Sequence, residues 1–291
     1  MKKKFIDPLI KRKANLTKNV QFFENTPLPS VIEISESGTC NRKCSFCPRS
    51  APDFKDIKEF ISDELITKLS QQLSKYNYSG IFLYSGFVEP MVDKNIFNLV
   101  SITRKNLPNA RIEMVTNGDA LNKERIKKLY SSGLSTLLIS IYDGKKEADD
   151  MEKLMKSCNL SDEQFKVRHR YLSESESFGI TLTNRSGMME NAEYKIPTLK
   201  EPLKKPCYYP HYTFFMDYTG EVLVCSHDWG KRLIVGNLKN ENFIDIWRNQ
   251  KFNLARKKLY KSDRNFSPCD KCDVTGTFMG GEHAKQWQKL Y

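Results

Sequence analysis

Short apolar segments that alternate with amphipathic ones restrict the fold of this 291-residue chain more than any other feature of its sequence. The first four apolar segments are each followed by a segment whose apolar residues recur at helical spacing. Repeated strand–helix units favour parallel strands joined by right-handed crossovers. Strands are expected at residues 31–35, 81–85, 111–116, 135–142, 165–168 and 179–184. Six units are too few for a closed eight-stranded barrel, so the sequence predicts an α/β fold built on a partial, open (β/α)6 barrel.

Residues that cap helices support this pattern. Ser62 stands where an N-cap is expected, before a helix with Leu65 and Leu69 on its apolar face. Gly133 follows the third helix and suits the left-handed conformation of a C-terminal cap. Barrels of this kind carry their chemistry on the loops after the C-terminal ends of the strands. The residues after each strand are therefore the first candidates for a functional site.

The pattern changes after about residue 200. The stretch DYTGEVLVC, residues 217–225, places turn residues between two apolar runs and predicts a β-hairpin. A helix is expected from Asn242 and can continue as far as Leu259. We therefore expect a basic N-terminal arm over residues 1–30, the barrel over residues 31–200, and a small β-hairpin and helix domain over residues 201–291.

The composition is that of an ordinary globular protein, with 39% hydrophobic and 28% charged residues. No run of about 18 apolar residues could span a membrane, and the N-terminus lacks the apolar stretch of a secretory signal. The expected location is the cytoplasm, where thiols stay reduced. Eight cysteines in a reducing compartment indicate metal binding rather than disulfide bonds.

The formal net charge is +12, and half of the excess lies in the first 20 residues, which hold seven Lys and Arg residues against the single acid Asp7. We interpret this arm as a solvated segment. Attraction to a polyanion, such as a nucleic acid, a lipid or a phosphorylated substrate, is the alternative. The rest of the excess is spread thinly over the chain, so a nucleic acid is not an expected partner.

Three cysteines with the spacing Cys-x3-Cys-x2-Cys lie just after the first strand, in CNRKCSFC: Cys40, Cys44 and Cys47. Zinc sites use four protein ligands, or three and a water molecule, and the nearest histidine in the sequence is His169. A cubane iron–sulfur cluster has four irons, so three thiolates leave one iron open for another molecule. The spacing therefore indicates a 4Fe–4S cluster with a vacant coordination position.

The stretch CNRKCSFC resembles the signature of the radical S-adenosylmethionine (SAM) superfamily, including an aromatic residue, Phe46, before the last cysteine. The resemblance implies that the open iron binds the amino and carboxylate groups of SAM. It also implies that one electron from the reduced cluster cleaves the sulfonium, and that the resulting 5′-deoxyadenosyl radical abstracts hydrogen from an unactivated carbon. An external reductant such as flavodoxin or ferredoxin is implied as a partner.

Other strand ends match positions that this family uses to bind SAM. YSGFVEP, residues 84–90, resembles the Gly-Gly-Glu-Pro segment that binds the methionine amino group, although Phe87 and Val88 occupy its middle. The third strand ends in TNG and the fourth in SIYDG. For each residue the alternative is an ordinary turn or surface role. The resemblance implies cofactor contacts from Gly86, Glu89, Ser140 and Arg168, and substrate contacts from Asn184 and Arg185.

A second group of four cysteines lies after residue 200: Cys207, Cys225, Cys269 and Cys272. Their spacing alone would also suit a zinc ribbon. Together with the first motif, the region resembles the SPASM/twitch extension of the superfamily, in the shorter twitch form because it holds four cysteines rather than seven. The resemblance implies one auxiliary 4Fe–4S cluster with four cysteine ligands and no open iron. Such a cluster can accept an electron but cannot bind substrate.

These features predict an enzyme that oxidises an alcohol of a small sugar, polyol or aminocyclitol derivative, with the auxiliary cluster as electron acceptor. A phosphorylated or nucleotide-linked substrate would suit the basic charge. The alternatives are a peptide or protein maturase, an RNA-modifying enzyme, and a zinc-binding protein without enzymatic activity. A further alternative is an epimerase in which Cys158 returns a hydrogen atom to the substrate radical; otherwise Cys158 is a half-buried structural residue.

Overall fold

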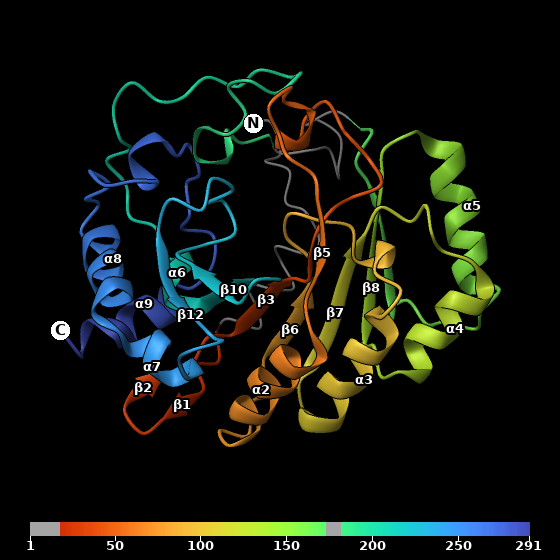
Figure 1. Cartoon of the computed structure of the whole chain (residues 1–291), viewed down its shortest axis with the longest axis horizontal. Helices are drawn as coiled ribbons and strands as arrows, with labels where there is room; N and C mark the ends of the chain where they lie inside the picture. Colours follow the sequence, from red (N-terminus) through yellow and green to blue (C-terminus); the bar gives the residue numbers. More distant parts are fainter. Residues whose placement is uncertain (1–17, 173–181) are drawn as a thin grey trace.

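The computed structural model describes residues 18–172 and 182–291, and these residues are organised around an eight-stranded sheet (Figure 1). The strand order is β12-β11-β10-β3-β6-β7-β8-β9, and the strands from β10 to β9 are parallel. This architecture confirms the predicted α/β fold. The strands are β3 (Val31–Ser35), β6 (Ile81–Tyr84), β7 (Arg111–Thr116), β8 (Thr136–Ile141), β9 (Phe165–His169), β10 (Thr213–Asp217), β11 (Glu221–Leu223) and β12 (Ile234–Asn237).

The sixth parallel strand comes from a different part of the sequence than expected. The strand predicted at residues 179–184 falls partly outside the described residues, and residues 182–184 are not in a strand. Instead, β10 pairs in parallel with β3 along its whole length, from Thr213 opposite Val31 to Asp217 opposite Ser35. The predicted hairpin is confirmed as β10 and β11, but it extends the main sheet and does not form a separate one.

The helices α2 to α5 lie between successive parallel strands. They are α2 (Asp63–Ser74), α3 (Ile96–Asn106), α4 (Lys123–Ser131) and α5 (Lys145–Lys156). The N-cap prediction is confirmed, because the Ser62 side chain accepts a hydrogen bond from the backbone N–H of Leu65. Gly133 follows α4 with a φ of 106°, and a side chain there would collide with Arg104. Both helix ends are thus positioned by the residues that the sequence indicated.

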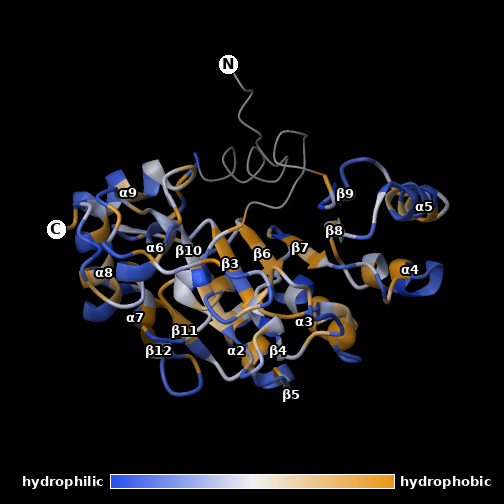
Figure 2. Ribbon diagram, turned by 90° about the horizontal axis from the view of Figure 1, so that it is seen from above, coloured by the Kyte–Doolittle hydropathy of each residue, from blue (hydrophilic) through white to orange (hydrophobic). Residues whose placement is uncertain are grey.

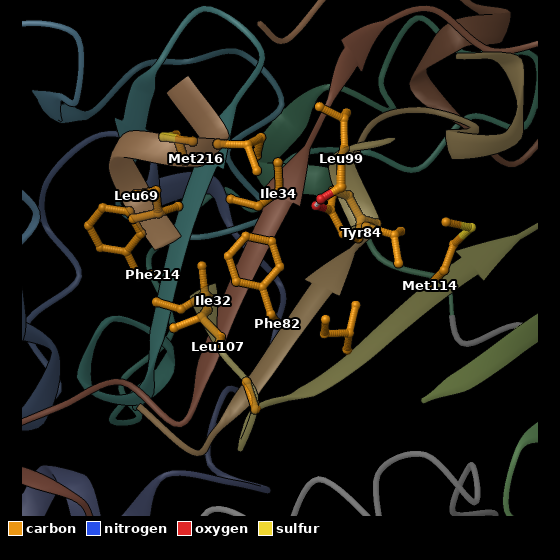
Figure 3. Packing of buried hydrophobic residues seen from close by; sticks show 14 of the residues in the cluster. Ile32, Ile34, Leu69, Phe82, Tyr84, Leu99, Leu107, Met114, Phe214 and Met216 are labelled. Carbon is orange, nitrogen blue, oxygen red and sulfur yellow. Dashed lines mark hydrogen bonds between the residues drawn. The ribbon is translucent and has the colours of Figure 1, made fainter. Parts of the chain in front are cut away.

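The main core lies between the sheet and the helices α2 and α3 (Figure 3). Alternate residues of each strand face this core, and they lie side by side in register. Leu69 of α2 and Leu99 of α3 cover them (Figure 3). Figure 2 shows hydrophobic residues along the central strands and hydrophilic residues on the outer loops. The core-facing strand residues are Ile32, Ile34, Phe82, Tyr84, Met114, Phe214 and Met216.

The C-terminal region adds helices beside β10, β11 and β12 (Figure 1). Its helices are α6 (Tyr209–Tyr212), α7 (Phe243–Arg248), α8 (Gln250–Tyr260) and α9 (Gly281–Gln288). The single helix that could run from Asn242 to Leu259 is corrected to two helices, α7 and α8. Asn249 has an extended backbone (ψ 164°), and its side chain accepts the backbone N–H of Phe252 as the N-cap of α8.

Shorter elements adjoin the residues of interest. Two antiparallel ladders pair β1 (Phe22–Phe23) with β2 (Thr26–Pro27) and β4 (Ser37–Gly38) with β5 (Ile57–Phe60). Single 3₁₀ turns lie next to cysteines or other predicted site residues. They are η1 (Pro48–Ser50), η2 (Pro90–Val92), η3 (Arg185–Gly187) and η4 (Cys269–Lys271).

The described end of the N-terminal segment is folded against the C-terminal helices. The indole N–H of Trp247 donates to the carbonyl oxygen of Pro27 at 2.8 Å. Arg248 donates to the hydroxyl of Thr26 at 2.6 Å. Residues 1–17 of the predicted basic arm lie outside the described residues. Among the helices that the structure describes, none is long and apolar enough to cross a membrane.

A buried arginine joins the C-terminal helices to one another. The guanidinium of Arg256 in α8 lies 4.0 Å from the ring centre of Trp247, 4.2 Å from that of Phe252 and 3.8 Å from that of Trp287. It donates to the carbonyl oxygens of Pro210 at 2.8 Å and Trp247 at 2.7 Å. Cation–π contacts and hydrogen bonds to carbonyl oxygens offset the cost of burying this charge.

We predict that Arg256→Ala lowers the free energy of unfolding by about 3 kcal/mol, because it leaves a cavity and carbonyl oxygens without donors. The change is measured by denaturant unfolding of the purified protein. Lys251→Ala, on the exposed face of the same helix, is the control and should change the stability by less than about 0.5 kcal/mol. Equal stability of the two variants would contradict a structural role for Arg256.

Candidate functional site

The parallel strands β3, β6, β7 and β8 end at one edge of the sheet, and the loops that follow them surround a cavity of about 170 Å³. We call it the inner pocket. All three cysteines of the first group line it, and so do four of the six other predicted site residues. The structure therefore brings together residues that the sequence separates by as many as 145 positions, from Cys40 to Arg185. These lining residues are Cys40, Cys44, Cys47, Gly86, Glu89, Ser140 and Arg185.

The loop that carries the first three cysteines is tied to the ends of two neighbouring strands. Arg42 donates from Nε to Oδ2 of Asp119 at 2.7 Å, and it also contacts Asp143 at 2.9 Å. Asn41 donates to the same Asp119 carboxylate at 2.7 Å. Asn117 donates to the side-chain oxygen of Asn41 at 2.8 Å. Residues between the cysteines thus hold the loop in place, while the thiols face the pocket.

Burial dominates the electrostatics of the three thiols. It raises the pKa of Cys40 to about 11. It also raises the pKa of Cys44 and of Cys47, and at Cys47 a hydrogen bond from the Arg49 backbone and the charges of Arg185 and Arg49 oppose this effect. Thiols in such surroundings keep their protons at neutral pH until a metal displaces them. The environment therefore suits cysteines that ligate a metal cluster better than free nucleophiles.

The loop after β6 closes one side of the inner pocket. Gly86 has a φ of 102°, and a Cβ atom there would lie 2.9 Å from the Cβ of Ser35. Only glycine fits this close approach of two strand ends. Ser35 in turn accepts the backbone N–H of Phe87 at 3.2 Å. The position is consistent with the predicted role of Gly86, which stays a prediction.

Glu89 connects this loop to the end of β7. Its carboxylate is buried and accepts hydrogen bonds from the hydroxyl of Thr116 at 2.6 Å, the backbone N–H of Asn117 at 2.6 Å and that of Met91 at 3.0 Å. Burial raises the pKa of Glu89, and these hydrogen bonds oppose the shift. The TNG sequence that ends β7 thus serves to hold Glu89 against the pocket.

Ser140 and Arg168 lie next to each other on adjacent strands. Ser140 is the last residue but one of β8 and lines the inner pocket. Arg168 in β9 donates to the Ser140 hydroxyl at 3.2 Å but is not itself among the lining residues. In this structure Arg168 therefore contacts a residue of the pocket wall, Ser140, but does not itself line the pocket.

Asn184 directly precedes a backbone segment, beginning at Arg185, that is held in the left-handed region. Arg185, Ser186 and Gly187 have φ angles of 47°, 53° and 94°. Non-glycine residues adopt this conformation only where surrounding contacts enforce it. Asn184 is fully buried and donates to the carbonyl oxygen of Lys271 at 2.7 Å, so its side chain lies against the second cysteine group and not in the inner pocket.

Arg185 connects the inner pocket to the second cysteine group. Its guanidinium lines the pocket and donates to Nδ1 of His227 at 3.4 Å. Burial, together with the nearby charge of Arg185, lowers the pKa of His227 to about 3. A neutral histidine can accept this bond, which assigns the unprotonated nitrogen to Nδ1. His227 itself lines the cavity that holds the second group of cysteines.

The second group of cysteines surrounds an enclosed, almost entirely apolar cavity. Cys207, Cys225, Cys269 and Cys272 all line it. Burial raises the pKa of Cys207 to about 11 and raises those of the other three. Gly276 has a φ of 73°, and a Cβ atom there would collide with the Cys207 sulfur. Only glycine therefore fits beside the Cys207 sulfur at this position.

Arg264 connects two of the backbone segments that surround this cavity. It is buried and donates to the carbonyl oxygens of Lys205 at 2.9 Å, Pro206 at 3.0 Å, Val274 at 2.8 Å and Thr275 at 2.9 Å. These residues precede Cys207 and follow Cys272. One side chain thus joins the two segments that bring distant cysteines together.

The cysteine geometry fits iron–sulfur clusters. Among the residues that the structure describes, no three Cys, His, Asp or Glu side chains converge closely enough to hold a single metal ion. A cubane cluster takes one thiolate on each iron that the protein ligates. The three cysteines of the inner pocket therefore suit a cluster with one open iron, and the four of the second cavity suit a cluster with none.

Cys158 lies at the opposite end of the sheet. It follows the C-terminus of α5, next to Tyr130, whose hydroxyl donates to the carbonyl oxygen of Gln164 at the start of β9. The inner pocket is at the other ends of the strands. This placement corrects the alternative in which Cys158 returns a hydrogen atom to the substrate radical, and it leaves Cys158 as a residue packed against the core.

Sequence reasoning missed several residues that shape the site. Asp119, Trp229 and Arg264 act through partners far away in the sequence, which a single sequence does not reveal. One of them had a local signal, because Asp119 directly follows TNG at the end of a predicted strand. His227 was not missed: its position in CSHDWG predicts a residue that borders the second cluster, and it lines the second cavity.

Comparison with known proteins agrees with this geometry. A model of the Radical SAM superfamily matches residues 34–184, which is more than half of the chain. The chain belongs to the radical SAM superfamily. A model described as an iron–sulfur cluster-binding domain (SPASM) matches residues 207–273 and covers all four cysteines of the second group. The radical SAM match covers all three cysteines of the first group.

Several known proteins resemble this radical SAM chain. The S-adenosyl-L-methionine-dependent 2-deoxy-scyllo-inosamine dehydrogenase of Niallia circulans is 29% identical over 84% of the chain and 92% of that protein. The crystal structure of BtrN in complex with AdoMet and 2-DOIA superposes with a TM-score of 0.73 and 26% identity, over 89% of this chain and 98% of that one. Native anSMEcpe with bound AdoMet has 13% identity and a TM-score of 0.55, over 89% and 96%, and shows likeness of fold alone.

The family membership identifies the cofactors as 4Fe–4S clusters and SAM. The residues present fit both clusters, as the cysteine geometry shows. We assign the first cluster to Cys40, Cys44 and Cys47 and the second to the other four cysteines as predictions that metal analysis can test.

Anaerobically reconstituted protein is predicted to hold about eight irons per chain, four at each cysteine group. Cys44→Ala and Cys272→Ala should each reduce the iron content to about four, because each removes a ligand from one group only. Iron and zinc are measured by elemental analysis, and the clusters by Mössbauer spectroscopy. Zinc bound to the second group in place of iron would contradict the assignment.

We predict that Asp119→Asn releases iron from the first cluster about threefold faster to a chelator, because it weakens a half-exposed contact that holds the loop. The rate is followed by the loss of cluster absorbance in Cys272→Ala protein, which isolates the first cluster. Asp149→Asn, which removes a surface pair with Lys145 on α5, is the matched control and should leave the rate unchanged. Equal rates for both variants would exclude a positioning role for Asp119.

Proposed function

We propose that this radical SAM enzyme is a dehydrogenase that oxidises a secondary alcohol of an aminocyclitol to a ketone. The similarity to the Niallia circulans dehydrogenase extends over nearly the whole of both chains, and the BtrN structure with AdoMet and 2-DOIA has the same fold. These relatives support the reaction and the substrate class. The observation in this structure that most directly supports the proposal is a contact between the two cysteine sites.

That contact is the hydrogen bond between Arg185 and His227. Arg185 lines the inner pocket, and His227 lines the enclosed cavity of the second cysteine group. Substrate in the inner pocket is therefore close to both sites. An oxidation needs such proximity, because hydrogen is removed at one site and an electron must leave to the other. The four cysteines of the second cavity are enough to ligate every iron of one cluster. No iron at this site is therefore left open for a substrate.

When bound, SAM and the two clusters would supply a 5′-deoxyadenosyl radical that takes the hydrogen atom from carbon and a one-electron acceptor for the remaining electron, while the hydroxyl proton is lost to solvent. The side chains of the protein shape the pocket and contact the bound molecules. Gly86 permits close approach to the pocket wall, and Glu89 fixes the loops that form it. We propose that Ser140, oriented by Arg168, contacts SAM and that Arg185 contacts the substrate. Asn184 positions Arg185 by holding its strained backbone.

The reaction also needs an electron to start it, and we propose flavodoxin or ferredoxin as the donor. Cys44 is only half-buried and its neighbour Lys43 is exposed, so the first cysteine loop reaches the surface of the protein. Such a donor, and seven cysteines that must stay reduced, favour a cytoplasmic location.

We predict that Cys40→Ala abolishes release of 5′-deoxyadenosine, because the first cluster loses a ligand. Cys269→Ala should keep release measurable but stop formation of the ketone, because the electron has no acceptor. Both products are measured by mass spectrometry with 2-deoxy-scyllo-inosamine as the test substrate and dithionite as the reductant. Full ketone formation by Cys269→Ala would contradict the acceptor role of the second site.

A further inference from the structure

A second cavity, of about 540 Å³, opens beside the inner pocket. We call it the outer pocket. The two pockets share three lining residues, Arg49, Phe87 and Trp229, so they adjoin each other. Ser35 and Asp217 also line it, which places it over the carboxyl ends of β3 and β10. The site proposed above uses only the inner pocket and leaves this larger space without an assigned ligand.

Aromatic side chains form one wall of the outer pocket. The ring centre of Trp229 lies 4.5 Å from that of Phe87 and 6.3 Å from that of Phe54. Phe54 lines the outer pocket but not the inner one, and the guanidinium carbon of Arg49 lies 5.0 Å from the centre of its ring. Aromatic walls with a few polar groups are typical of pockets that bind small organic molecules.

Four bases and three acids line the outer pocket. Arg49 is paired with Asp56, which lies outside the lining, and Lys231 is paired with both Asp217 and Glu221, so acids offset the bases around the pocket. Phosphate sites instead present an excess of basic groups together with backbone N–H donors. A phosphorylated or nucleotide-linked group, which the overall charge of the chain had suggested, is therefore not what this pocket favours. The remaining charged lining residues are two acids and two bases: Asp53, Glu190, Lys55 and Arg232.

The outer pocket is large enough for a sugar ring. Pockets of about 300–1,000 Å³ enclose ligands of drug size, and its volume of about 540 Å³ falls within this range. An aromatic wall offers contact to the apolar face of a sugar ring, and the acids and bases of the lining offer partners to its hydroxyl and amino groups.

Resting on the proposed dehydrogenase activity, we infer that the substrate has two rings: the ring that is oxidised in the inner pocket, and a linked, unphosphorylated sugar ring in the outer pocket against Phe54 and Trp229. The linkage passes the shared residues Phe87 and Arg49. The enzyme then acts after a glycosyl transfer, which must supply this substrate.

The test compares three ligands on the reconstituted holoenzyme with SAM: 2-deoxy-scyllo-inosamine, the same cyclitol carrying one glucosamine ring, and its phosphate ester. Binding is measured by calorimetry without reductant, and ketone formation is measured separately. The two-ring ligand should bind about tenfold more tightly than the single ring, as one aromatic contact and a few hydrogen bonds would provide. Equal binding of these two ligands, or tightest binding of the phosphate ester, would overturn the inference.

Variants locate the second ring. Phe54→Ala should weaken binding of the two-ring ligand about tenfold and that of the single ring less than about twofold. Phe60→Ala removes an exposed aromatic ring of β5 that does not line the pocket, so it should alter neither. Glu190 is exposed, so Glu190→Gln should not disturb folding. This variant should weaken binding of the two-ring ligand by about twofold to threefold. A loss in Phe54→Ala that is equal for both ligands, or no loss in either variant, would overturn the inference.

The outcomes separate this inference from the proposed function. Oxidation of the single ring without preference for the two-ring ligand would overturn the inference alone. Preferential binding of the two-ring ligand without formation of a ketone would support the pocket assignment and contradict the dehydrogenase. Failure of both cyclitols to bind would overturn both.

Discussion

The pairing of β10 with β3 is the constraint on which the rest of the site depends. The first strand of the barrel would otherwise be an edge, with unsatisfied backbone groups and an apolar face. Five residue pairs from the C-terminal region cover it, and Phe214 and Met216 continue the core of Ile32 and Ile34. Cys207 precedes the start of β10 and Cys225 follows the end of β11, so this pairing places both toward the amino end of β3, whereas the first cysteines follow its carboxyl end. The continuous sheet thus sets the spacing between the two cysteine groups.

Buried hydrogen bonds also hold the segment of Arg185 against the loop that carries Cys269 and Cys272. Asn184 joins the segment before Arg185 to the loop of Cys269 and Cys272, and Arg264 joins the segments on either side of that loop. Because the backbone from Arg185 to Gly187 is held in the left-handed region, Arg185 has little freedom to move. Its contact with His227 is therefore a consequence of the second cysteine site being folded.

The sequence was sufficient for the features that local chemistry determines. The periodicity of apolar residues located five parallel strands, Ser62 and Gly133 marked helix ends, and cysteine spacing separated an open site from a closed one. It failed where long-range pairing decides the outcome. The parallel pairing of β10, the break at Asn249 and the position of Cys158 away from the pocket depend on contacts between distant segments. These long-range contacts cannot be predicted from a single sequence.

The central claim is that the first cysteine site alone leaves a metal position open for SAM. Electron–nuclear double resonance of the reduced enzyme with SAM labelled at the amino nitrogen and carboxylate oxygen tests it most directly. The account predicts coupling of both labels to the cluster at Cys40, Cys44 and Cys47, retained in Cys272→Ala protein and lost in Cys44→Ala protein. Coupling that survives in Cys44→Ala and disappears in Cys272→Ala would contradict it.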